Sequence, residues 1–561
     1  MSSRTSLGVV IPVALLLLGG AARSVETATS HYLQGLQHAE DGESGKAIDE
    51  MRLAWQLDST AAEIPRELAR LLLEADRPDE AVPPVQRAIA LSPNDPEAHW
   101  LLGQILLQKS RPAEAVTALR RAWELDPGQK SYLVTLILAL EANGEPEEAL
   151  RRLDPAQGGV APDSPYLFMR RGLLRGRLGQ AREALLDFLE AIKLAPGYPG
   201  AADHLLAICW RLGPSNETAS ACAEALELEP ARTELRRELA RILITLGRQV
   251  EAIPHLERLH AEDPRDAGVS MQLGVIRFSQ ERLAEAIELF TQVRGIDPSL
   301  PDTDDWLWRA LNRADSLQAA LRLADVMVAR SPNDRRAHWY HALSLAQLGR
   351  NEEALAALSE VLRLAPNDRD AGLLAAMLFE ELGRMSEARA RLERLLELRS
   401  DDREVLFRLA RVEEKEGQVE AALGWLRRLL EAHPDDANAL NEAGYLCADN
   451  GIHLEQALDW ATGAVALDGD NAAYVDSFGW ALYRLGRYAE AITQLERAAK
   501  LAAQEPEIRI HLAKAFRGAG RVEEGRRVLR ELLAEQPHER RAWELLQLWG
   551  SAEPDSVGNP R

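Results

Sequence analysis

The chain has 561 residues but contains few cysteines and few aromatic side chains. Its three cysteines, Cys209, Cys222 and Cys447, are too few for a disulfide framework and lack the spacing of zinc ligands. Aromatic residues make up only 5% of the chain, and Ala, Leu, Glu and Arg dominate instead. Because these four are strong helix formers, the composition predicts an all-helical protein.

Positive charge is also scarce, since 66 Lys and Arg residues stand against 88 Asp and Glu residues and the formal net charge is −22. Most of the surface would therefore repel a polyphosphate, and we expect no nucleic acid among the partners. With 46% hydrophobic and 27% charged residues, the composition is that of a folded chain rather than a disordered one.

One apolar run stands apart, at residues 7–18, after the basic Arg4 and before the small residues 19–22. A charged start, a short apolar stretch and small residues are the parts of a secretory signal peptide. Residues 1–24 are therefore predicted to direct export to the periplasm or the cell envelope. The alternative is an uncleaved N-terminal anchor, and we expect contact with a membrane through this segment only.

A pattern of small residues recurs in steps of 34 along nearly the whole chain. One place in the repeating unit is often glycine, at Gly35, Gly103, Gly172, Gly274, Gly444 and Gly479. Twelve residues further on there is almost always an alanine, such as Ala354 or Ala491. After another twelve residues a proline such as Pro332 or Pro366 often closes the unit.

This pattern resembles the tetratricopeptide-repeat (TPR) family over nearly all of the chain. The resemblance implies an all-α fold, a right-handed α-solenoid of about fifteen stacked helix-turn-helix units. The units are expected to start near residues 28, 62, 96, 130, 165, 199, 233, 267, 301, 335, 369, 403, 437, 472 and 506.

The spacing has a physical reason of its own. Each unit contains two amphipathic helices, with apolar residues three and four apart. A glycine such as Gly349 or Gly383 ends the first helix in the left-handed conformation, and the proline ends the second. One helical hairpin cannot bury its apolar face alone, so neighbouring hairpins must stack into a continuous core.

We group the expected units into residues 28–164, 165–334 and 335–538. Residues 539–550 are expected to form a capping helix over the end of the stack, and residues 551–561 a disordered tail. The pattern fits least well at residues 153–163, 213–215 and 452–453.

No set of catalytic residues stands outside the repeat pattern, so we expect neither an enzyme nor a cofactor or metal site. His338 and His341 lie three apart on a helix but have no third ligand nearby in the sequence. Cys209 and Cys222 are expected on facing sides of the two helices of one unit. They would be two packed thiols or, in an oxidising compartment, a disulfide.

The TPR resemblance also implies a binding surface, because the first helix of each TPR unit lines the inner face and its fifth, ninth and twelfth places point toward a partner. From residue 335 onward these places hold Trp339, Met377, Phe407, Arg411, Asn441, Tyr445, Asp476, Trp480 and Tyr483, flanked by Tyr340, Arg408 and Arg484. Exposed aromatic and Arg side chains are typical of protein recognition, and Asn and Asp could bind the backbone of a guest peptide. The alternative is that several of the aromatic rings pack against the adjoining unit.

A narrower resemblance covers Asn441 to Ile492, which is similar to a passage shared by proteobacterial envelope TPR proteins. These include outer-membrane lipoproteins that act as adaptors for a periplasmic processing protease. The present chain lacks their lipidated cysteine, which leaves both membrane attachment and the protease partner open.

The leading hypothesis is an exported, non-enzymatic adaptor or scaffold that binds other proteins or extended peptides in the concave groove. One alternative is a structural subunit of an envelope assembly or a polysaccharide-export machine. A third hypothesis, an enzyme with an unrecognised site, would require a bound metal or cofactor. The sequence names neither the partner nor the pathway.

Overall fold

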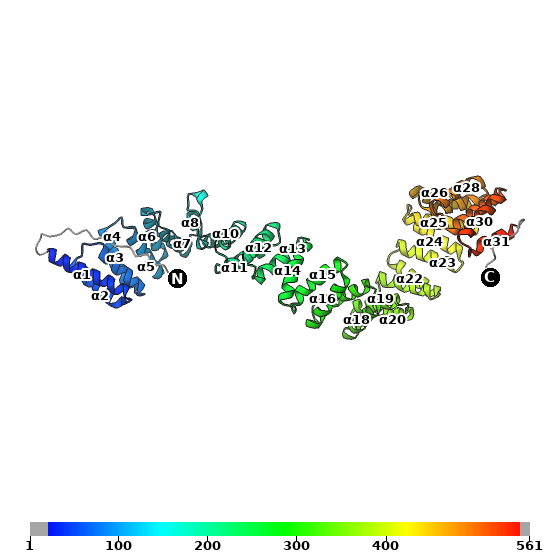
Figure 1. The fold of residues 1–561 in the computed structure, drawn as a ribbon. Coiled ribbons are helices and arrows are strands. Elements are labelled where there is room, and N and C mark those ends of the chain that lie inside the picture. Colours follow the sequence, from blue (N-terminus) through cyan, green and yellow to red (C-terminus); the bar gives the residue numbers. More distant parts are fainter. Residues whose placement is uncertain (1–20, 550–561) are drawn as a thin grey trace. The chain divides into compact units, whose positions relative to one another are not determined.

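The computed structural model describes residues 21–549, and this part of the chain consists of helices joined by short turns (Figure 1). Residues 21–549 contain 31 α-helices, one short 3-10 helix and no β-strand. The prediction of an all-helical protein is therefore confirmed. The predicted signal peptide falls mainly on residues 1–20 and the predicted tail on 551–561, which lie outside the described residues; residues 21–24 belong to the first helix.

The chain divides into two compact units, with the boundary between Ile276 and Arg277, inside helix α15 (Ala267–Ser279). The helices before this boundary are α1 (Ala21–Glu40), α2 (Ser44–Leu57), α3 (Glu63–Glu74), α4 (Pro78–Leu91), α5 (Pro96–Gln108), α6 (Pro112–Leu125), α7 (Lys130–Ala142), α8 (Pro146–Arg152), the 3-10 helix η1 (Pro155–Gln157), α9 (Pro165–Arg177), α10 (Ala181–Leu194), α11 (Ala201–Leu212), α12 (Asn216–Leu228), α13 (Thr233–Thr245) and α14 (Gln249–Glu262).

The helices after the boundary are α16 (Leu283–Ile296), α17 (Thr303–Arg313), α18 (Leu317–Arg330), α19 (Arg335–Gln347), α20 (Asn351–Leu364), α21 (Arg369–Glu381), α22 (Met385–Leu398), α23 (Arg403–Lys415), α24 (Val419–Ala432), α25 (Ala437–Asn450), α26 (Leu454–Leu467), α27 (Ala472–Arg484), α28 (Tyr488–Leu501), α29 (Pro506–Gly518), α30 (Val522–Glu535) and α31 (Arg540–Leu548).

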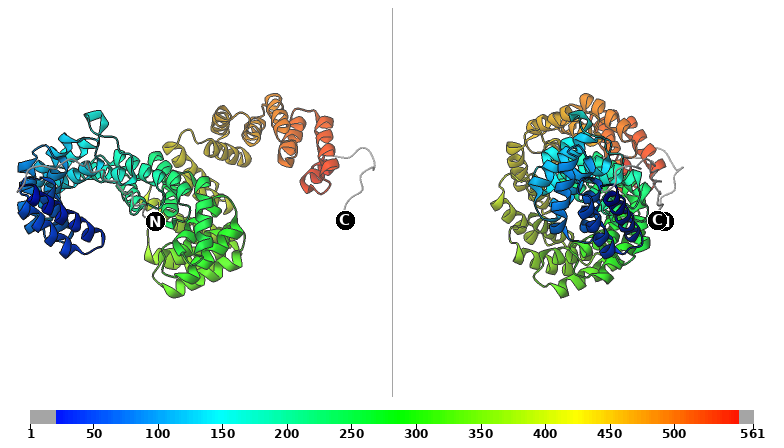
Figure 2. Two further views of the ribbon diagram at one scale, coloured as in Figure 1. Left: turned by 60° about the vertical axis from the view of Figure 1, so that its left-hand side comes forward. Right: turned by 90° about the vertical axis from the view of Figure 1, so that its left-hand side faces the viewer.

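From α1 to α30, odd-numbered helices are the first helices of the units and even-numbered helices are the second. Within each compact unit, a helical hairpin lies beside the next hairpin along the chain (Figure 2). From residue 335 onward, first helices begin at the expected residues, at Arg335, Arg369, Arg403, Ala437, Ala472 and Pro506. The expected capping segment contains α31, whose Ala542 is buried and which packs in one cluster with Leu529 and Leu532 of α30.

The weak places in the sequence pattern correspond to local departures from the regular hairpin. Helix α8 has only seven residues and is followed by η1, so this unit has a shortened second helix. The turn before α12 is closed by a capping box between Ser215 and Thr218. His453, which occupies the extra position before α26, has a left-handed backbone with φ of 48°.

Small residues permit the two helices of a unit to approach closely. A Cβ atom added at Gly479 would lie 2.6 Å from Cγ of Leu495, and one at Gly172 would lie 2.7 Å from Cε1 of Phe188. The alanine that follows the glycine place by twelve residues is fully buried, as at Ala491. A larger side chain at either place would push the helix axes apart.

The expected facing of Cys209 and Cys222 is also observed. Their Sγ atoms lie 3.5 Å apart across the hairpin of α11 and α12, and both thiols are buried and free. The hydrogen bond to Cys209, followed by burial, raises the pKa of the Cys222 thiol. The structure therefore shows two packed thiols at this place.

The turn after each first helix requires a left-handed residue, and in most units glycine supplies it. Gly349, Gly383, Gly417 and Gly486 have φ between 71° and 77°. The same turn is made by residues with a side chain in other units, such as Asp315 with φ of 53° and Ser110 with φ of 55°. A side chain in this conformation costs free energy that glycine does not.

Substituting Ser110→Gly is therefore expected to raise the free energy of unfolding by about 0.5–1 kcal/mol, measured by denaturant unfolding. Ser110 is exposed, so the substitution removes strain without opening a cavity. The reverse change at an equivalent turn, Gly383→Ser, should lower the free energy of unfolding. A neutral or destabilising Ser110→Gly substitution would contradict the assignment of strain to this turn.

Candidate functional site

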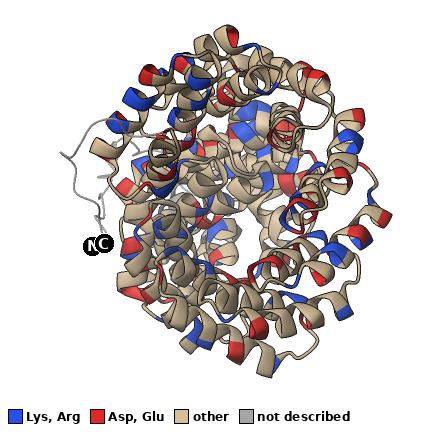
Figure 3. Cartoon of the chain, turned by 90° about the vertical axis from the view of Figure 1, so that its right-hand side faces the viewer, with Lys and Arg blue, Asp and Glu red and all other residues tan. Residues whose placement is uncertain are grey.

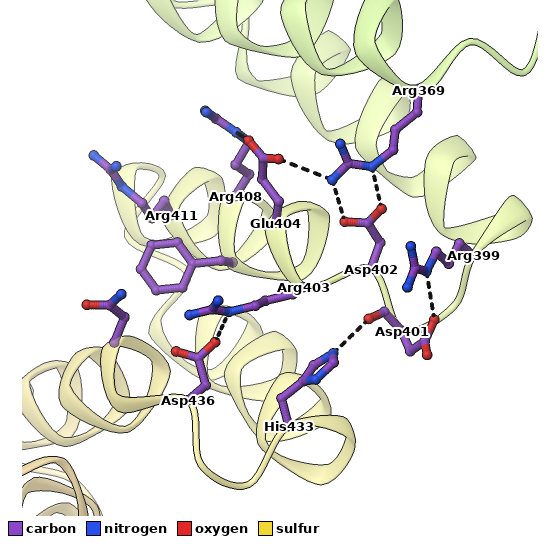
Figure 4. Close-up of a pocket in the computed structure, with 12 residues that line it drawn as sticks. Arg369, Arg399, Asp401, Asp402, Arg403, Glu404, Arg408, Arg411, His433 and Asp436 are labelled. Carbon is purple, nitrogen blue, oxygen red and sulfur yellow. Dashed lines mark hydrogen bonds and ion pairs between the residues drawn. The ribbon is translucent and has the colours of Figure 1, made fainter. Parts of the chain in front are cut away.

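The expected binding residues lie on the first helices α19 to α27, all after Arg277, and some of them line two hollows of the surface. We call the first the Phe407 pocket (Figure 4). Its volume is 690 Å³, and it is lined by Arg369, Arg399, Asp401, Asp402, Arg403, Glu404, Phe407, Arg408, Arg411, His433, Asp436 and Asn438. These residues come from three successive units, so the pocket runs across the stack rather than into one hairpin.

Ion pairs between neighbouring units form the rigid part of this pocket. The Arg369 guanidinium donates from Nε to Oδ2 of Asp402 at 2.6 Å and from Nη2 to Oε2 of Glu404 at 3.1 Å (Figure 4). Arg403 pairs in the same way with Asp436. Both aspartates also cap the helix that follows them, since Oδ1 of Asp402 accepts from the Val405 N–H and Oδ1 of Asp436 from the Ala439 N–H.

These contacts define the electrostatics of the pocket. The hydrogen bond from Arg369 lowers the pKa of Asp402. Burial opposes ionisation of Asp436, but hydrogen bonds from Arg403 and from the Ala439 N–H hold its pKa below the ordinary value. Both carboxylates are therefore charged, and each already accepts hydrogen bonds from an arginine and from a backbone N–H. They position the first turns of α23 and α25.

These repeated ion pairs between arginine and aspartate were not predicted from the sequence. An Arg at the first position of a first helix pairs with the Asp that caps the first helix of the next unit. The pairs are Arg335–Asp368, Arg369–Asp402 and Arg403–Asp436. Their constant separation of 33 residues in the sequence was the signal that could have revealed them.

The side chains of α23 that the sequence selected all keep some exposed surface. Phe407 is half-buried against the core of the stack, and Arg408 lies 3.4 Å from Glu404. Arg411 is exposed and has no ion-pair partner among the described residues. Asn438 accepts a hydrogen bond from the Tyr474 hydroxyl at 2.7 Å. The pocket therefore offers an apolar ring, an unpaired guanidinium and an amide side by side.

Other predicted residues are half-buried on the same helices. Trp339, Met377, Asn441, Tyr445 and Tyr483 each retain some exposed surface. Trp339 packs at the edge of the cluster that contains Leu358 and Val361, and the side-chain oxygen of Asn441 accepts no hydrogen bond from the described residues.

Three of the predicted residues are interior residues, and the expectation that they are exposed in a groove is wrong. Tyr340 is 6% exposed because it stacks on Trp308 with ring centroids 4.2 Å apart. Asp476 is 5% exposed because its carboxylate binds His511. Trp480 is 3% exposed and packs between neighbouring rings. Tyr340 and Trp480 instead pack against rings of the adjoining units, which was the alternative expectation for these aromatic residues.

The environment of Trp480 is an aromatic stack centred on a buried histidine. The Trp480 ring lies 4.1 Å from the His511 ring and 4.8 Å from the Tyr483 ring, measured between centroids. His511 places Nδ1 2.9 Å from Oδ2 of Asp476 and Nε2 3.3 Å from Oε1 of Glu507. Glu507 in turn accepts a hydrogen bond from Nη1 of Arg541 in α31 at 2.6 Å.

The protonation states in this network follow from its geometry. Burial lowers the pKa of His511, but hydrogen bonds to Asp476 and Glu507 outweigh it, so the pKa is raised overall. The hydrogen bonds from His511 and Arg541 lower the pKa of Glu507 to about 2 against the opposing effect of burial. A doubly protonated imidazole satisfies both carboxylates and links α27 to α29.

The second hollow, which we call the Trp480 pocket, lies beside this network. Its volume is 480 Å³, and it is lined by Asp449, Trp480, Tyr483, Arg484, Lys514, Arg517, Gly518, Leu545 and Trp549. Elsewhere in the chain, positive and negative side chains are interspersed along the helices (Figure 3).

Family models described as tetratricopeptide repeat match most of the chain. One matches residues 66–130, 307–369, 373–437 and 426–472, a second matches residues 106–274, and a third matches residues 482–548. The chain therefore belongs to the tetratricopeptide-repeat family. None of the matching families is catalytic, and this fold is typically a non-enzymatic interaction scaffold.

No curated protein matches the chain. Among solved structures, a chain of the APC/C hetero-tetramer Cut9–Hcn1 is 16% identical over 87% of this chain and 96% of that one, with a TM-score of 0.34. YrrB, described as a TPR protein with an unusual peptide-binding site, is 20% identical over 33% of this chain and 95% of that one, with a TM-score of 0.29. MamA from Desulfovibrio magneticus RS-1 is 24% identical over 31% of this chain and 97% of that one, with a TM-score of 0.28. The family assignment rests on the repeat models and not on these structures.

Within residues 21–549, no helix combines the length and apolar character needed to cross a membrane. The two histidines that the sequence placed three apart have local partners: Nε2 of His338 bonds to the Pro332 carbonyl at 2.9 Å, and Nε2 of His341 lies 3.1 Å from Asp325. No group of three or more metal-ligating side chains occurs in the described part of the chain.

The His511 network predicts a pH dependence of stability at the C-terminal end of the stack. Because the pKa of His511 is raised on folding, its contribution is complete below its unfolded pKa of about 6.5 and is lost as pH rises through the folded pKa. Glu507 contributes above its unfolded pKa of about 4.5, and this contribution is lost as pH falls toward 2. Thermal unfolding should therefore show less stability at pH 9 than at pH 6.

The variant His511→Gln should lose that difference between pH 6 and pH 9, since its side chain does not titrate. His538→Gln is the matched control, because His538 is exposed near the same end of the chain. If His511→Gln kept the full pH dependence of the parent protein, the protonated state assigned to His511 would be incorrect.

Proposed function

We propose that this protein is a non-catalytic scaffold that binds extended segments of partner proteins along the first helices α19 to α29. The Phe407 pocket is the observation that carries the proposal. TPR proteins in general mediate protein–protein interactions, and this pocket has the size and chemistry for such a ligand.

The form of the pocket favours an extended segment over a compact small molecule. Lining residues come from α21, α23 and α25, so a ligand that fills the pocket touches three units. The half-buried Phe407 ring supplies apolar contact, and the unpaired Arg411 supplies a donor for carbonyl or carboxylate oxygens. An extended peptide presents the matching groups, apolar side chains and backbone carbonyl oxygens, in alternation along its length.

The pocket is also organised in advance. Arg369, Arg403 and their aspartate partners are fixed by ion pairs between units, so the first turns of α23 and α25 do not need to be ordered on binding. A surface that is ordered before association loses less conformational entropy, and more of the contact energy is available as affinity.

The double variant Phe407→Ala, Arg411→Glu should weaken partner binding by about tenfold or more, because it removes an aromatic anchor and reverses the unpaired charge. Partners would be obtained by cross-linking and pull-down from the native cell, and their affinity measured with purified proteins. The matched control is Leu398→Ala, Arg394→Glu, which makes the same kinds of change at exposed residues of the second helix α22. Unchanged affinity in the Phe407 variant, with an unaltered circular dichroism spectrum, would reject this pocket.

We further propose, from residues 1–24 and the envelope resemblance of Asn441 to Ile492, that the scaffold is exported and acts as an adaptor of the bacterial cell envelope. Fractionation should then recover a shortened chain outside the cytoplasm, with its new N-terminus near Ala22 or Ser24 by mass spectrometry. An unprocessed chain in the membrane fraction would instead favour the structural-subunit alternative. A full-length chain in the cytoplasm would contradict export.

A further inference from the structure

We propose that the Trp480 pocket binds carboxylate side chains of an acidic segment in a partner protein. This inference rests on the proposed function and names the chemistry of one part of the partner. It is carried by an excess of unpaired positive charge in a pocket with aromatic walls, within a chain that is otherwise strongly acidic.

The charge of the pocket is unusual for this molecule. Arg484, Lys514 and Arg517 line it against one carboxylate, that of the exposed Asp449. None of the three cations forms an ion pair with a carboxylate of the described residues; Arg484 donates from Nη1 to the main-chain oxygen of Asp449 at 2.6 Å.

Nearby arginines outside the pocket behave differently. At the starts of the adjoining second helices, Arg487 pairs with Glu490 at 2.7 Å and Arg521 pairs with Glu524 at 2.5 Å. In a chain with a net charge of −22, carboxylates are available to most arginines. Three cations that are not paired with carboxylates of this chain can therefore bind carboxylates of another molecule.

The aromatic rings hold the cations in place. Nζ of Lys514 lies 4.9 Å from the centroid of the Trp480 ring, and the Arg484 guanidinium lies 5.8 Å from it. The Arg517 guanidinium lies 5.0 Å from the centroid of the Trp549 ring. Cation–π contacts fix the position of a charge without neutralising it, so the side chains are oriented while they still attract an anion.

The environment of Lys514 disfavours an isolated positive charge. Burial lowers the pKa of the Lys514 ammonium, and the positive charge of Arg541 lowers it further. The pocket is also rich in donors, because the indole N–H groups of Trp480 and Trp549 find no acceptor among the described residues. A carboxylate would neutralise the excess charge.

The walls of the pocket favour a peptide segment over a free inorganic anion. Leu545 and the half-buried Tyr483 provide apolar surface beside the cations, and a simple anion would leave this surface uncovered. A segment in which Asp or Glu alternates with apolar residues matches both features. Its carboxylates would reach Lys514 and Arg517 while its apolar side chains cover Leu545 and Tyr483.

The test uses the full-length protein and a fluorescent octapeptide, capped at both ends, in which glutamate alternates with leucine. Anisotropy titration should show that this peptide binds about tenfold more tightly than the isosteric peptide with glutamine in place of glutamate. That preference should shrink as salt is raised. It should disappear in the double variant Lys514→Met, Arg517→Gln and persist in Arg530→Gln, which removes an exposed positive charge from the second helix α30.

Two further arms separate this proposal from its rivals. The variant Phe407→Ala, Arg411→Glu should keep the preference for glutamate, so loss of the Phe407 pocket and loss of the Trp480 pocket give different results. Inorganic phosphate or a single-stranded oligonucleotide that bound the pocket more tightly than the glutamate peptide would overturn the proposal. Equal affinity of the parent protein for the glutamate and glutamine peptides, or no binding of either, would also overturn it.

Discussion

The structure depends on the close approach of the two helices within each repeat. Gly479 and Gly172 stand where a Cβ atom would collide with Leu495 or Phe188, and Ala491 is fully buried against the partner helix. This contact fixes the geometry of one hairpin, but it leaves an apolar face that only the next hairpin can cover. The same hairpin is consequently repeated through the described part of the chain.

The proposed binding surface follows from that repetition. Stacking places the first helices α19 to α29 in sequence, and the ion pairs from Arg369 to Asp402 and from Arg403 to Asp436 connect α21 to the start of α23 and α23 to the start of α25. Side chains between these connections, such as Phe407 and Arg411, keep exposed surface that a partner could contact. The repeat thus provides both the residues that maintain the fold and the residues proposed to meet a ligand.

The sequence predicted the fold more completely than the site, because the two depend on different information. Helix starts and the left-handed turn at Gly383 follow from local periodicity, which is visible in one unit at a time. Burial of Tyr340 and Trp480 depends on which side chain the neighbouring unit presents: Trp308 covers the first and His511 the second. Position within the repeat selected Phe407 and Trp480 equally, and only the three-dimensional contacts distinguish an accessible ring from an interior one.

The central claim is that partners bind to the first helices after Arg277 and not to the second helices. A photo-crosslinking amino acid placed in the native cell at Met377, a half-buried position of α21, tests it directly. The matched position is Leu398, which is 50% exposed at the end of the second helix α22. The account predicts covalent adducts with partner proteins from position 377 and none from position 398. Adducts from position 398 alone would contradict it.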